Sequence, residues 1–435
     1  MMPLYAKKAT APLAGTLTPP GDKSISHRAL IFGGLADGET VVEGLLVSAD
    51  TTATRNAMVQ LGASVTDEGD VLRIRGLGQA GLSAPSAPLD MGNSGTAMRL
   101  LAGVLAAQSF DSVLTGDASL NSRPMRRIMT PLAQMGANVE ATEAGTAPLH
   151  IHGNPALKGI HYDSPVASAQ IKSCVLLAGL FAQGESRVTE PRLSRDHTER
   201  MLPLFGVRMG EGAALQGPQG LTGAKVLVPS DPSSAAFLVA VASLVPGSDV
   251  TLRNVGLNPT RSAFFDAVKA MGGRIDIETV NDGSDGLEPV GDLRVRYNGR
   301  LKGIDLPPEW VPAMIDEIPI LMALAATAQG RTRVTDAAEL RVKESDRLAV
   351  MARGLECMGI ELSERPDGVD VFGGEPCPAR VEAENDHRCA MSFAVLGQLI
   401  EEGVLIDGAD YIDTSYPGFS ADMLSIGAQL ERRDG

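Results

Sequence analysis

The sequence predicts an α/β protein of two domains, each built from three βαβαββ repeats. Two patterns carry this prediction. An amphipathic helix that ends in glycine and runs into a short strand recurs at intervals of 66 to 87 residues. A second kind of helix, with a polar start and an apolar body, alternates with the first. Six such repeats exceed what one hydrophobic core usually holds, so we divide them three and three.

The amphipathic helices place a glycine directly after their last turn, where a left-handed residue commonly closes a helix. In chain order the segments are "TRNAMVQLGASV" (54–65), "MRRIMTPLAQMGANVE" (125–140), "TERMLPLFGVRM" (198–209), "FFDAVKAMGGRIDI" (264–277), "AVMARGLECMGIEL" (349–362) and "ADMLSIGAQL" (421–430). Their glycines are Gly62, Gly136, Gly206, Gly272, Gly359 and Gly427.

The second kind of helix has small and apolar residues on every side after its polar start, which is typical of a helix buried on all faces. In chain order these starts are "GDKSISHRAL" (21–30), "GNSGTAMRLL" (92–101), "SAQIKSCVLL" (168–177), "DPSSAAFLVA" (231–240), "DEIPILMALA" (316–325) and "DHRCAMSFAV" (386–395).

Strands with β-branched residues follow the buried helices, for example "GETVVEGL" (38–45) and "GSDVTLRN" (247–254). The sixth repeat is cut short, and the N-terminal "LYAKKATAPL" could supply its missing strand. One domain is then discontinuous: residues 19–229 form the first domain, and residues 1–18 with 230–435 form the second. Both crossings, "LTPPGDK" and "VPSDPSS", are rich in proline, as linkers often are.

The composition restricts the partners of the protein. The chain of 435 residues has 38 basic and 53 acidic residues, for a net charge of −15. Nucleic acids and anionic membranes attract basic surfaces, so we expect neither as a partner. The N-terminus has no signal-peptide pattern, and the four cysteines have no metal-ligand spacing. We expect a cytoplasmic monomer that needs no metal or organic cofactor.

The polar starts of the buried helices indicate an anion-binding function. A helix N-terminus has unpaired N–H groups and the positive end of a dipole. If the buried helices of each domain run parallel, their starts emerge on one face, and two such faces opposed across a hinge form an anion-binding cleft. The basic residues at these starts or in nearby turns are Lys23, Arg28, Arg99, Arg123, Arg195, Lys343, Arg347 and Arg388.

Two carboxylates among these cations indicate proton transfer in addition to binding. Asp316 opens the fifth buried helix, and Glu344 lies between Lys343 and Arg347 in "RVKESDR". The alternatives are purely structural. Asp316 could be a helix N-cap, and Glu344 could lie on a solvated helix face, paired with Arg347 three residues later.

These motifs resemble the 5-enolpyruvylshikimate-3-phosphate synthases. The resemblance covers nearly the whole chain and rests on "PGDKSISHRAL", "GNSGTAMR", "RP" at 123–124, "ASAQIKS", "SRDHTE", "DPSSAAF", "RVKESDR" and "DHRCAMSF". "SAQ" and "RDHTE" are more similar to the second, herbicide-tolerant bacterial class. The family fold is a two-domain inside-out α/β barrel that closes over its substrates, with three βαβαββ repeats in each domain.

The resemblance implies transfer of the enolpyruvyl group of phosphoenolpyruvate to the 5-hydroxyl of shikimate 3-phosphate. It implies that Asp316 takes the hydroxyl proton and that Glu344, with Lys23, protonates the methylene carbon. The residues implied to bind shikimate 3-phosphate are Lys23, Ser24, Arg28, Ser168, Ala169, Gln170, Arg195, Asp316 and Lys343. Those implied to bind phosphoenolpyruvate are Lys23, Asn93, Gly95, Arg123, Gln170, Arg347 and Arg388.

The chain departs from the family pattern at three positions. Ala169 replaces a serine of the first class, so only its backbone is available to a ligand. "TSYP" (Thr414 to Pro417) stands where the first class has "KTFP", so one cation is missing. Gly95 stands where tolerant members often have alanine, whose methyl group would obstruct glyphosate more than phosphoenolpyruvate. We therefore expect this glyphosate target to be more sensitive than its class suggests.

Three other functions are alternatives to enolpyruvyl transfer to shikimate 3-phosphate. The UDP-N-acetylglucosamine enolpyruvyl transferases share the fold and the cosubstrate, but usually carry a reactive cysteine before their Arg-Pro, where this chain reads "GDASLNSRP". A sensor of phosphorylated metabolites needs no catalytic carboxylates, so Asp316 and Glu344 argue against it. A purely structural repeat protein leaves the basic helix starts unexplained.

Overall fold

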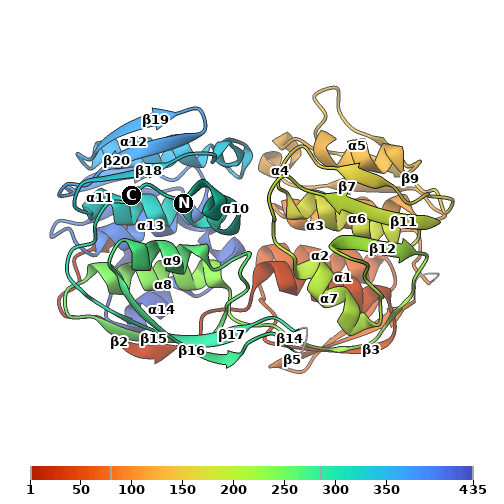
Figure 1. The fold of residues 1–435 in the computed structure, drawn as a ribbon, viewed down its shortest axis with the longest axis horizontal. Helices are drawn as coiled ribbons and strands as arrows, with labels where there is room; N and C mark the ends of the chain where they lie inside the picture. Colours follow the sequence, from red (N-terminus) through yellow and green to blue (C-terminus); the bar gives the residue numbers. More distant parts are fainter. Residues whose placement is uncertain (1, 79–80, 285–286, 434–435) are drawn as a thin grey trace. The chain divides into compact units, whose positions relative to one another are not determined.

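Six repeats of one α/β motif follow one another along the chain in the computed structural model, which describes residues 2–78, 81–284 and 287–433. The chain divides into two compact units. Unit 1 consists of Met1–Pro20 and Pro229–Gly435, and unit 2 of Gly21–Val228. In each unit the strands lie at the outer surface and the apolar helices lie inside (Figure 1). The division into domains 19–229 and 1–18 with 230–435 remains a prediction.

Unit 2 is built from three sheets around three buried helices. Its helices are α1(Lys23–Leu35), α2(Ala49–Gln60), α3(Gly95–Ala106), α4(Ala118–Ser122), α5(Arg126–Gln134), α6(Ala169–Gly179), α7(His197–Met201) and the 3₁₀ helix η1(Leu202–Phe205). Its strands are β3(Ala36–Glu43), β4(Ser64–Asp67), β5(Val71–Leu77), β6(Leu89–Asp90), β7(Ser112–Thr115), β8(Asn138–Glu140), β9(Leu149–His152), β10(His161–Asp163), β11(Gly184–Thr189), β12(Ala213–Gly217), β13(Leu221–Thr222) and β14(Lys225–Leu227).

Unit 1 repeats this plan. Its helices are α8(Pro232–Leu244), α9(Ala263–Ala270), α10(Val311–Met314), α11(Ile318–Thr327), α12(Arg347–Cys357), α13(His387–Gly397) and α14(Phe419–Ser425), with 3₁₀ helices η2(Pro308–Trp310), η3(Ile315–Glu317), η4(Ala338–Val342) and η5(Ala409–Thr414). Its strands are β1(Leu4–Lys7), β2(Ala14–Leu17), β15(Asp249–Gly256), β16(Arg274–Asn281), β17(Val290–Arg296), β18(Arg331–Val334), β19(Glu361–Arg365), β20(Gly368–Phe372), β21(Ala379–Glu382), β22(Val404–Asp407) and β23(Gln429–Arg432).

The sheets share one pairing pattern, which the repeats explain. The strand after a buried helix pairs in parallel with the strand before it, as in β6 with β7, β10 with β11 and β21 with β22. The later strands of each repeat pair antiparallel, as in the orders β6-β7-β9-β8 and β10-β11-β12. A parallel pair needs a crossover, and the buried helix supplies it.

The N-terminal segment completes unit 1, as predicted. Strand β1 lies between β22 and β23 and pairs antiparallel with both. A second contribution was not predicted: β2 pairs in parallel with β15 of the fourth repeat. In unit 2, β13 and β14 play the equivalent part by pairing in parallel with β3.

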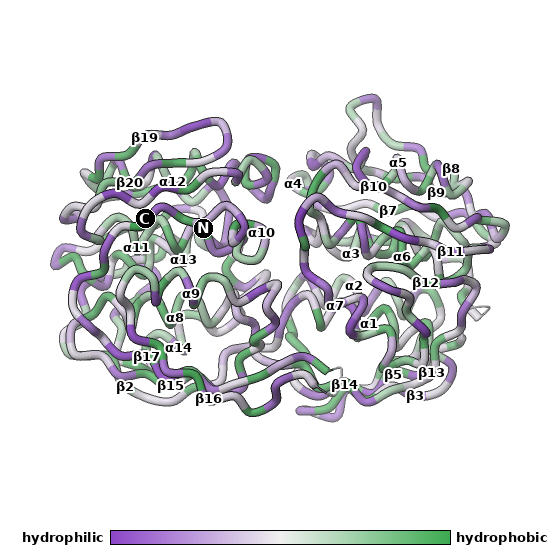
Figure 2. The backbone as a smooth tube through the Cα atoms, in the orientation of Figure 1, coloured by the Kyte–Doolittle hydropathy of each residue, from purple (hydrophilic) through white to green (hydrophobic). Residues whose placement is uncertain are grey.

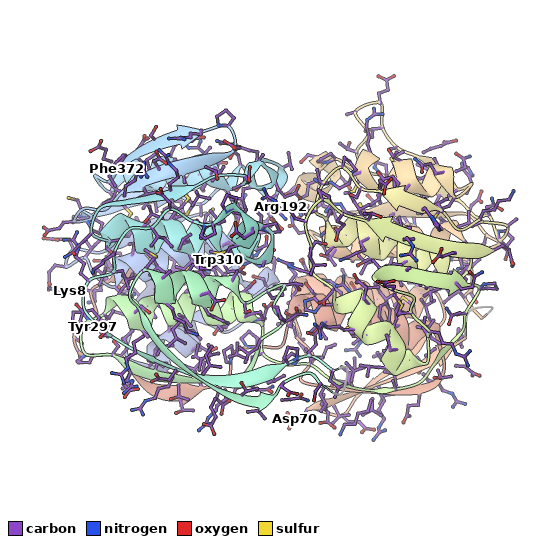
Figure 3. All side chains as sticks on the ribbon, viewed as in Figure 1. Lys8, Asp70, Arg192, Tyr297, Trp310 and Phe372 are labelled. Atoms are coloured by element: carbon purple, nitrogen blue, oxygen red, sulfur yellow. The ribbon has the colours of Figure 1, made fainter. Side chains whose placement is uncertain are left out.

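The predicted buried helices form the cores of the two units. All thirteen residues of α8 are buried, and eleven of the thirteen in α1 are buried. Figure 2 shows many hydrophobic residues along these inner helices, while the outer strands carry both hydrophobic and hydrophilic residues. Side chains such as Lys8 and Asp70 lie at the outer surface (Figure 3).

The predicted glycine closures are confirmed with one difference. All six glycines have positive φ angles, from 79° at Gly359 to 111° at Gly62. Five follow the helix cap, but Gly206 is itself the cap of η1. The helix predicted there is short, because it changes from α to 3₁₀ geometry at Leu202. Pro203 has no N–H with which to continue the α-helical ladder.

One helical stretch, Pro308–Thr327, is long and apolar enough to cross a membrane, but 72% of the window that meets this test is buried inside the structure. Its apolar residues, Met314 and Leu321 among them, belong to the hydrophobic core of unit 1.

Candidate active site

The starts of the buried helices follow one capping pattern. Five of the six have an N-cap side chain that accepts a hydrogen bond from a backbone N–H in the first turn, which satisfies one of the donors left unpaired at a helix start. These caps are Asp22, Ser94, Ser168, Asp231 and Asp386.

The fifth helix is the exception, and the structure corrects the N-cap interpretation of Asp316. Asp316 lies inside the 3₁₀ turn η3, one residue before Glu317, the uncapped N-cap of α11. Its carboxylate instead accepts a hydrogen bond of 2.9 Å from Nη1 of Arg347 and lies 3.7 Å from Nζ of Lys343. The side chain is therefore held by cations from another segment of the chain.

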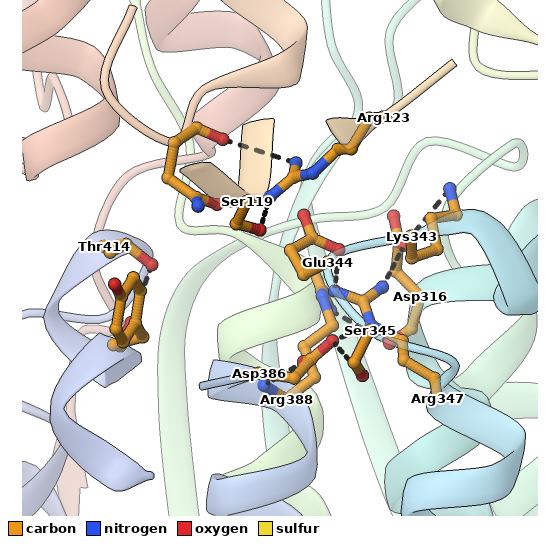
Figure 4. A network of polar contacts seen from close by, with 12 residues as sticks. Ser119, Arg123, Asp316, Lys343, Glu344, Ser345, Arg347, Asp386, Arg388 and Thr414 are labelled. Atoms are coloured by element: carbon orange, nitrogen blue, oxygen red, sulfur yellow. Dashed lines mark hydrogen bonds and ion pairs between the residues drawn. The ribbon is translucent and has the colours of Figure 1, made fainter. Parts of the chain in front are cut away.

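Arg347 is the hub of the candidate site in unit 1 (Figure 4). Its side chain is only 1% exposed, and its guanidinium donates to Asp316, to Glu344 at 2.5 Å and to Asp386 at 2.8 Å. Burial alone would lower the pKa of Arg347, but Asp386, Glu344 and Asp316 together raise the pKa well above its ordinary value. The guanidinium stays charged and joins three carboxylates from three segments.

The structure also corrects the solvated-face interpretation of Glu344. Helix α12 begins only at Arg347, with Asp346 as its N-cap, so Glu344 precedes the helix. Its pairing with Arg347 three residues later is present, but the partner is buried. Glu344 and Asp316 therefore bind the same guanidinium.

Arg388 lies in the first turn of α13 and is held from behind by a buried acid. Its Nη1 donates to the backbone oxygen of Asp316 at 3.1 Å and lies 3.5 Å from Oε1 of Glu317. Glu317 is 1% exposed and also accepts a hydrogen bond from Ser233 at the start of α8. Glu317 thus links the starts of three buried helices of unit 1.

In unit 2, the predicted cations of α1 have fixed partners. Lys23 forms an ion pair with Asp50, a buried residue in the first turn of α2. Nε of Arg28 donates to Thr198 and Nη2 to Ser173, both at 2.7 Å, and Nη1 donates to the backbone oxygen of Ser24 at 2.9 Å. These three hydrogen bonds orient the guanidinium of Arg28.

A second group in unit 2 joins the starts of α3 and α6. Nη1 of Arg99 donates to Oε1 of Gln170 at 2.6 Å, and Nε2 of Gln170 donates to Thr96 at 3.2 Å. Gly95 opens α3 directly beside this pair. A Cβ built on Gly95 would lie 2.9 Å from Nη1 of Arg99 and 3.4 Å from Nη1 of Arg123.

Arg123, the C-cap of α4, lies beside the same helix start. It donates to Oδ1 of Asn93 at 2.5 Å and to Ser119 at 3.2 Å (Figure 4). Asn93 is itself held by a 2.8 Å hydrogen bond to Asp117. The predicted residues Asn93, Gly95 and Arg123 are therefore brought together.

The remaining predicted residues lie at the start of α6 and in the loop before α7. Ser168 is the buried N-cap of α6, and Ala169 is its first residue. Arg195 is half-buried next to Asp196, the N-cap of α7. Thr414 begins the "TSYP" segment, which stands where the first class has "KTFP". Its hydroxyl donates to the backbone oxygen of Tyr411 at 2.6 Å.

The cysteines have no part in this site. Burial raises the pKa of Cys174 to about 12 and raises that of Cys389 well above its ordinary value. Both thiols are inside the core, as the apolar helices predicted, while Cys357 and Cys377 are exposed and unbonded to each other. Among residues 2–78, 81–284 and 287–433, no group of three His, Cys, Asp or Glu side chains could hold a metal ion.

The acids that hold the predicted cations in place were not among the predicted site residues. Asp50, Glu317 and Asp386 are all at least 95% buried. Asp386 could have been found, since it stands two residues before Arg388 at a predicted helix start. Asp50 and Glu317 left no such signal, because their partners come from other segments of the chain.

Comparisons with known proteins agree over almost the whole chain. A family model described as EPSP synthase (3-phosphoshikimate 1-carboxyvinyltransferase) matches residues 7–423. A 3-phosphoshikimate 1-carboxyvinyltransferase of Xanthomonas campestris pv. campestris is 53% identical over 427 residues, which cover 97% of this chain and 96% of the relative. One from Xanthomonas axonopodis pv. citri is 52% identical, covering 98% and 97%. The structure of EPSP synthase from Acinetobacter baumannii matches with a TM-score of 0.88 at 45% identity, over the full length of both chains.

Proposed function

This chain belongs to the EPSP synthase family, and on that premise we propose how its residues bind two substrates and move protons between them. The enzyme is a 3-phosphoshikimate 1-carboxyvinyltransferase of the shikimate pathway. It transfers the enolpyruvyl group of phosphoenolpyruvate to the 5-hydroxyl of shikimate 3-phosphate and releases phosphate.

Shikimate 3-phosphate is proposed to bind through the starts of α1 and α6 together with Asp316 and its neighbour Lys343. The positive charge of Arg28 and the N-terminal end of α6 suit its phosphate. The full proposed set is Lys23, Ser24, Arg28, Ser168, Ala169, Gln170, Arg195, Asp316 and Lys343.

Phosphoenolpyruvate carries a phosphate and a carboxylate, so it needs more than one cation. The proposed set is Lys23, Asn93, Gly95, Arg123, Gln170, Arg347 and Arg388. The fixed orientation of Arg123 by Asn93 and of Arg388 by Glu317 supports this assignment, because a guanidinium held in place loses less entropy when it binds an anion. The single cleft lined by residues of both units stays a prediction.

The proton transfers are assigned to the two carboxylates on Arg347. Glu344, with Lys23, protonates the methylene carbon of phosphoenolpyruvate, which leaves a cationic carbon. The 5-hydroxyl attacks this carbon and gives its proton to Asp316. The tetrahedral intermediate then expels phosphate, and the methyl group returns a proton to Glu344. Each well-placed acid or base contributes roughly 10²–10⁴ in rate.

One observation carries this assignment: Asp316 and Glu344, 28 positions apart in the sequence, bind the same buried guanidinium. The test is phosphate release with both substrates and with each alone. Asp316→Asn and Glu344→Gln keep the size of each side chain, and each is expected to lower kcat by roughly 10²-fold or more. Asp305→Asn, at an exposed ion pair with Arg331, is the control. Wild-type kcat in either catalytic variant would contradict the assignment.

The compartment and the oligomeric state are also proposals. The acidic chain and its charged small-molecule substrates support a cytoplasmic monomer. Sedimentation of the purified enzyme at micromolar concentration tests the oligomeric state, and a dimer mass would contradict it.

A further inference from the structure

A buried lysine that the reaction does not use lies one turn into α6. Lys172 is 1% exposed, and its ammonium lies 2.8 Å from Oε1 of Glu199 and 3.0 Å from Oε2 of Glu190. It also donates to the backbone oxygen of Ser194 at 3.4 Å. A lysine is almost never buried to this extent unless it is paired, so the group needs an explanation.

Glu190 connects the start of α6 to the loop that carries Arg195. Its Oε1 accepts hydrogen bonds of 2.7 Å from the backbone N–H of Ser168 and from the hydroxyl of Ser194. Its Oε2 accepts from the backbone N–H of Ser194 at 3.3 Å. One carboxylate therefore fixes Ser168, a proposed ligand of the substrate, and the residue directly before Arg195.

This carboxylate is also an electrostatic problem for the proposed site. The side chain of Glu190 is only 5% exposed, and it lies directly behind residues that are proposed to receive a phosphate group. An unpaired buried anion there would repel the phosphate and would be costly to desolvate. Lys172 supplies a balancing positive charge from inside the core, which Glu190 shares with Glu199.

We propose that Lys172 is a positioning residue for shikimate 3-phosphate. By pairing with Glu190 and Glu199, it offsets the negative charge behind the phosphate and allows Glu190 to hold Ser168 and the loop before Arg195. This inference rests on the proposed assignment of Ser168, Ala169 and Arg195 to shikimate 3-phosphate. Lys172 itself does not touch the substrate.

The test compares Lys172→Met, Glu190→Gln and the double variant in steady-state kinetics. Lys172→Met is expected to raise the KM for shikimate 3-phosphate about tenfold or more, which is the size of a lost charge-assisted interaction. The KM for phosphoenolpyruvate should change less than about threefold on the same scale. Lys225→Met, which breaks an exposed ion pair with Glu43, is the matched control and should leave both values unchanged.

The double variant separates neutralisation from a merely structural role. Glu190→Gln removes the negative charge but keeps a side-chain oxygen that can accept from Ser168 and Ser194. The double variant is therefore expected to regain most of the lost affinity for shikimate 3-phosphate. If Lys172→Met does not fold, the double variant and Lys172→Arg are used instead. Lys172→Arg, which keeps the charge, should bind the substrate as the wild type does, and the double variant should come close to it.

Three results would overturn the inference while leaving the proposed function intact, provided the wild-type enzyme releases phosphate. These are an unchanged KM for shikimate 3-phosphate in Lys172→Met, equal losses for both substrates, or a double variant as impaired as Lys172→Met. A wild-type enzyme without phosphate release would overturn the proposed function itself.

Discussion

Arg347 illustrates how a single residue in this protein acts through its surroundings. A buried guanidinium without partners would be strongly destabilising, and so would each of the buried carboxylates. Together they satisfy one another, since Asp386 is fully buried and binds Arg347 at 2.8 Å. In the proposed site, Arg347 would therefore bind an anionic substrate only together with its carboxylate partners. The same hydrogen bonds fix Asp316 and Glu344.

Two histidines of unit 2 are expected to have pKa values shifted in opposite directions. Burial, followed by the charges of Lys23 and Arg28, lowers the pKa of His27 well below 6.5, while the hydrogen bond to Asp111 raises the pKa of His152. At pH 6.5, NMR of the imidazole protons should show His27 neutral and His152 mostly charged. Asp111→Asn should lower the pKa of His152 and leave His27 unchanged; a common pKa for both would contradict the prediction.

The sign of the His27 effect on stability follows from linkage. The unfolded chain takes up a proton on His27 below about pH 6.5, but the folded protein does not, so acid favours unfolding. The contribution of neutral His27 to the free energy of unfolding is fully present above pH 6.5. It is lost as the pH falls toward the pKa of His27 in the folded protein, by up to about 1.4 kcal/mol for each pH unit. Urea unfolding of wild type and His27→Gln at pH 7.5 and 5.5 measures this; an equal difference at both pH values would count against it.

Gly95→Ala tests the expected glyphosate response. The added methyl group would lie 2.9 Å from the guanidinium of Arg99, which must shift, and 3.4 Å from that of Arg123, which it would touch. Overpacking of this kind costs roughly 1–3 kcal/mol. The methyl group should weaken the binding of glyphosate, the longer molecule, more than that of phosphoenolpyruvate. The inhibition constant for glyphosate should rise about tenfold or more. An inhibition constant equal to that of the wild type would refute the prediction.

At the scale of the elements, the repeating pattern made most of the fold predictable. Glycines with positive φ and polar helix starts are local signals, so all six amphipathic and all six buried helices could be placed. Local signals failed where geometry changes within an element. Pro203 shortens the helix at 197–201, and the helix start at Glu317 leaves the carboxylate of Asp316 to bind Arg347.

Gly272→Ala isolates the backbone contribution of one helix closure. Gly272 has φ of 93°, and a Cβ there would meet nothing within 4 Å. Alanine in the left-handed conformation should then lower the free energy of unfolding by about 1–2 kcal/mol, with no contribution from a clash. Gly220→Ala is the matched control, because its Cβ is equally free and its φ is not positive. Equal urea midpoints for the two variants would contradict this account.

At the scale of the whole molecule, the candidate site was predictable only in part. The cations could be identified because they stand at helix starts that the sequence marks. Their partners could not, because Asp50 and Glu317 reach them through tertiary contacts that no spacing encodes. The family resemblance supplied roles for the residues, and the structure supplied the buried carboxylates that hold them.

Unit 1 depends on a strand from the far end of the chain. Because β1 lies between β22 and β23, deletion of residues 2–7 should leave β23 without its sheet partner and remove the stability of unit 1. Limited proteolysis should then cut unit 1 rapidly while residues 21–228 resist, and activity should be lost. Lys8→Ala, at an exposed ion pair, is the control. A deleted protein that melts and reacts like the wild type would contradict the prediction.

The same strand determines the order in which a newly made chain can mature. Tyr5 hydrogen-bonds Glu402, 397 positions later. At roughly 5–20 residues per second, a ribosome needs about 20–80 s to make the partners of the first strand. Residues 21–228 can reach their folded state during that time. The first strand must wait without partners, and the unit that contains Asp316 and Arg347 is completed only after β22 and β23 have been made.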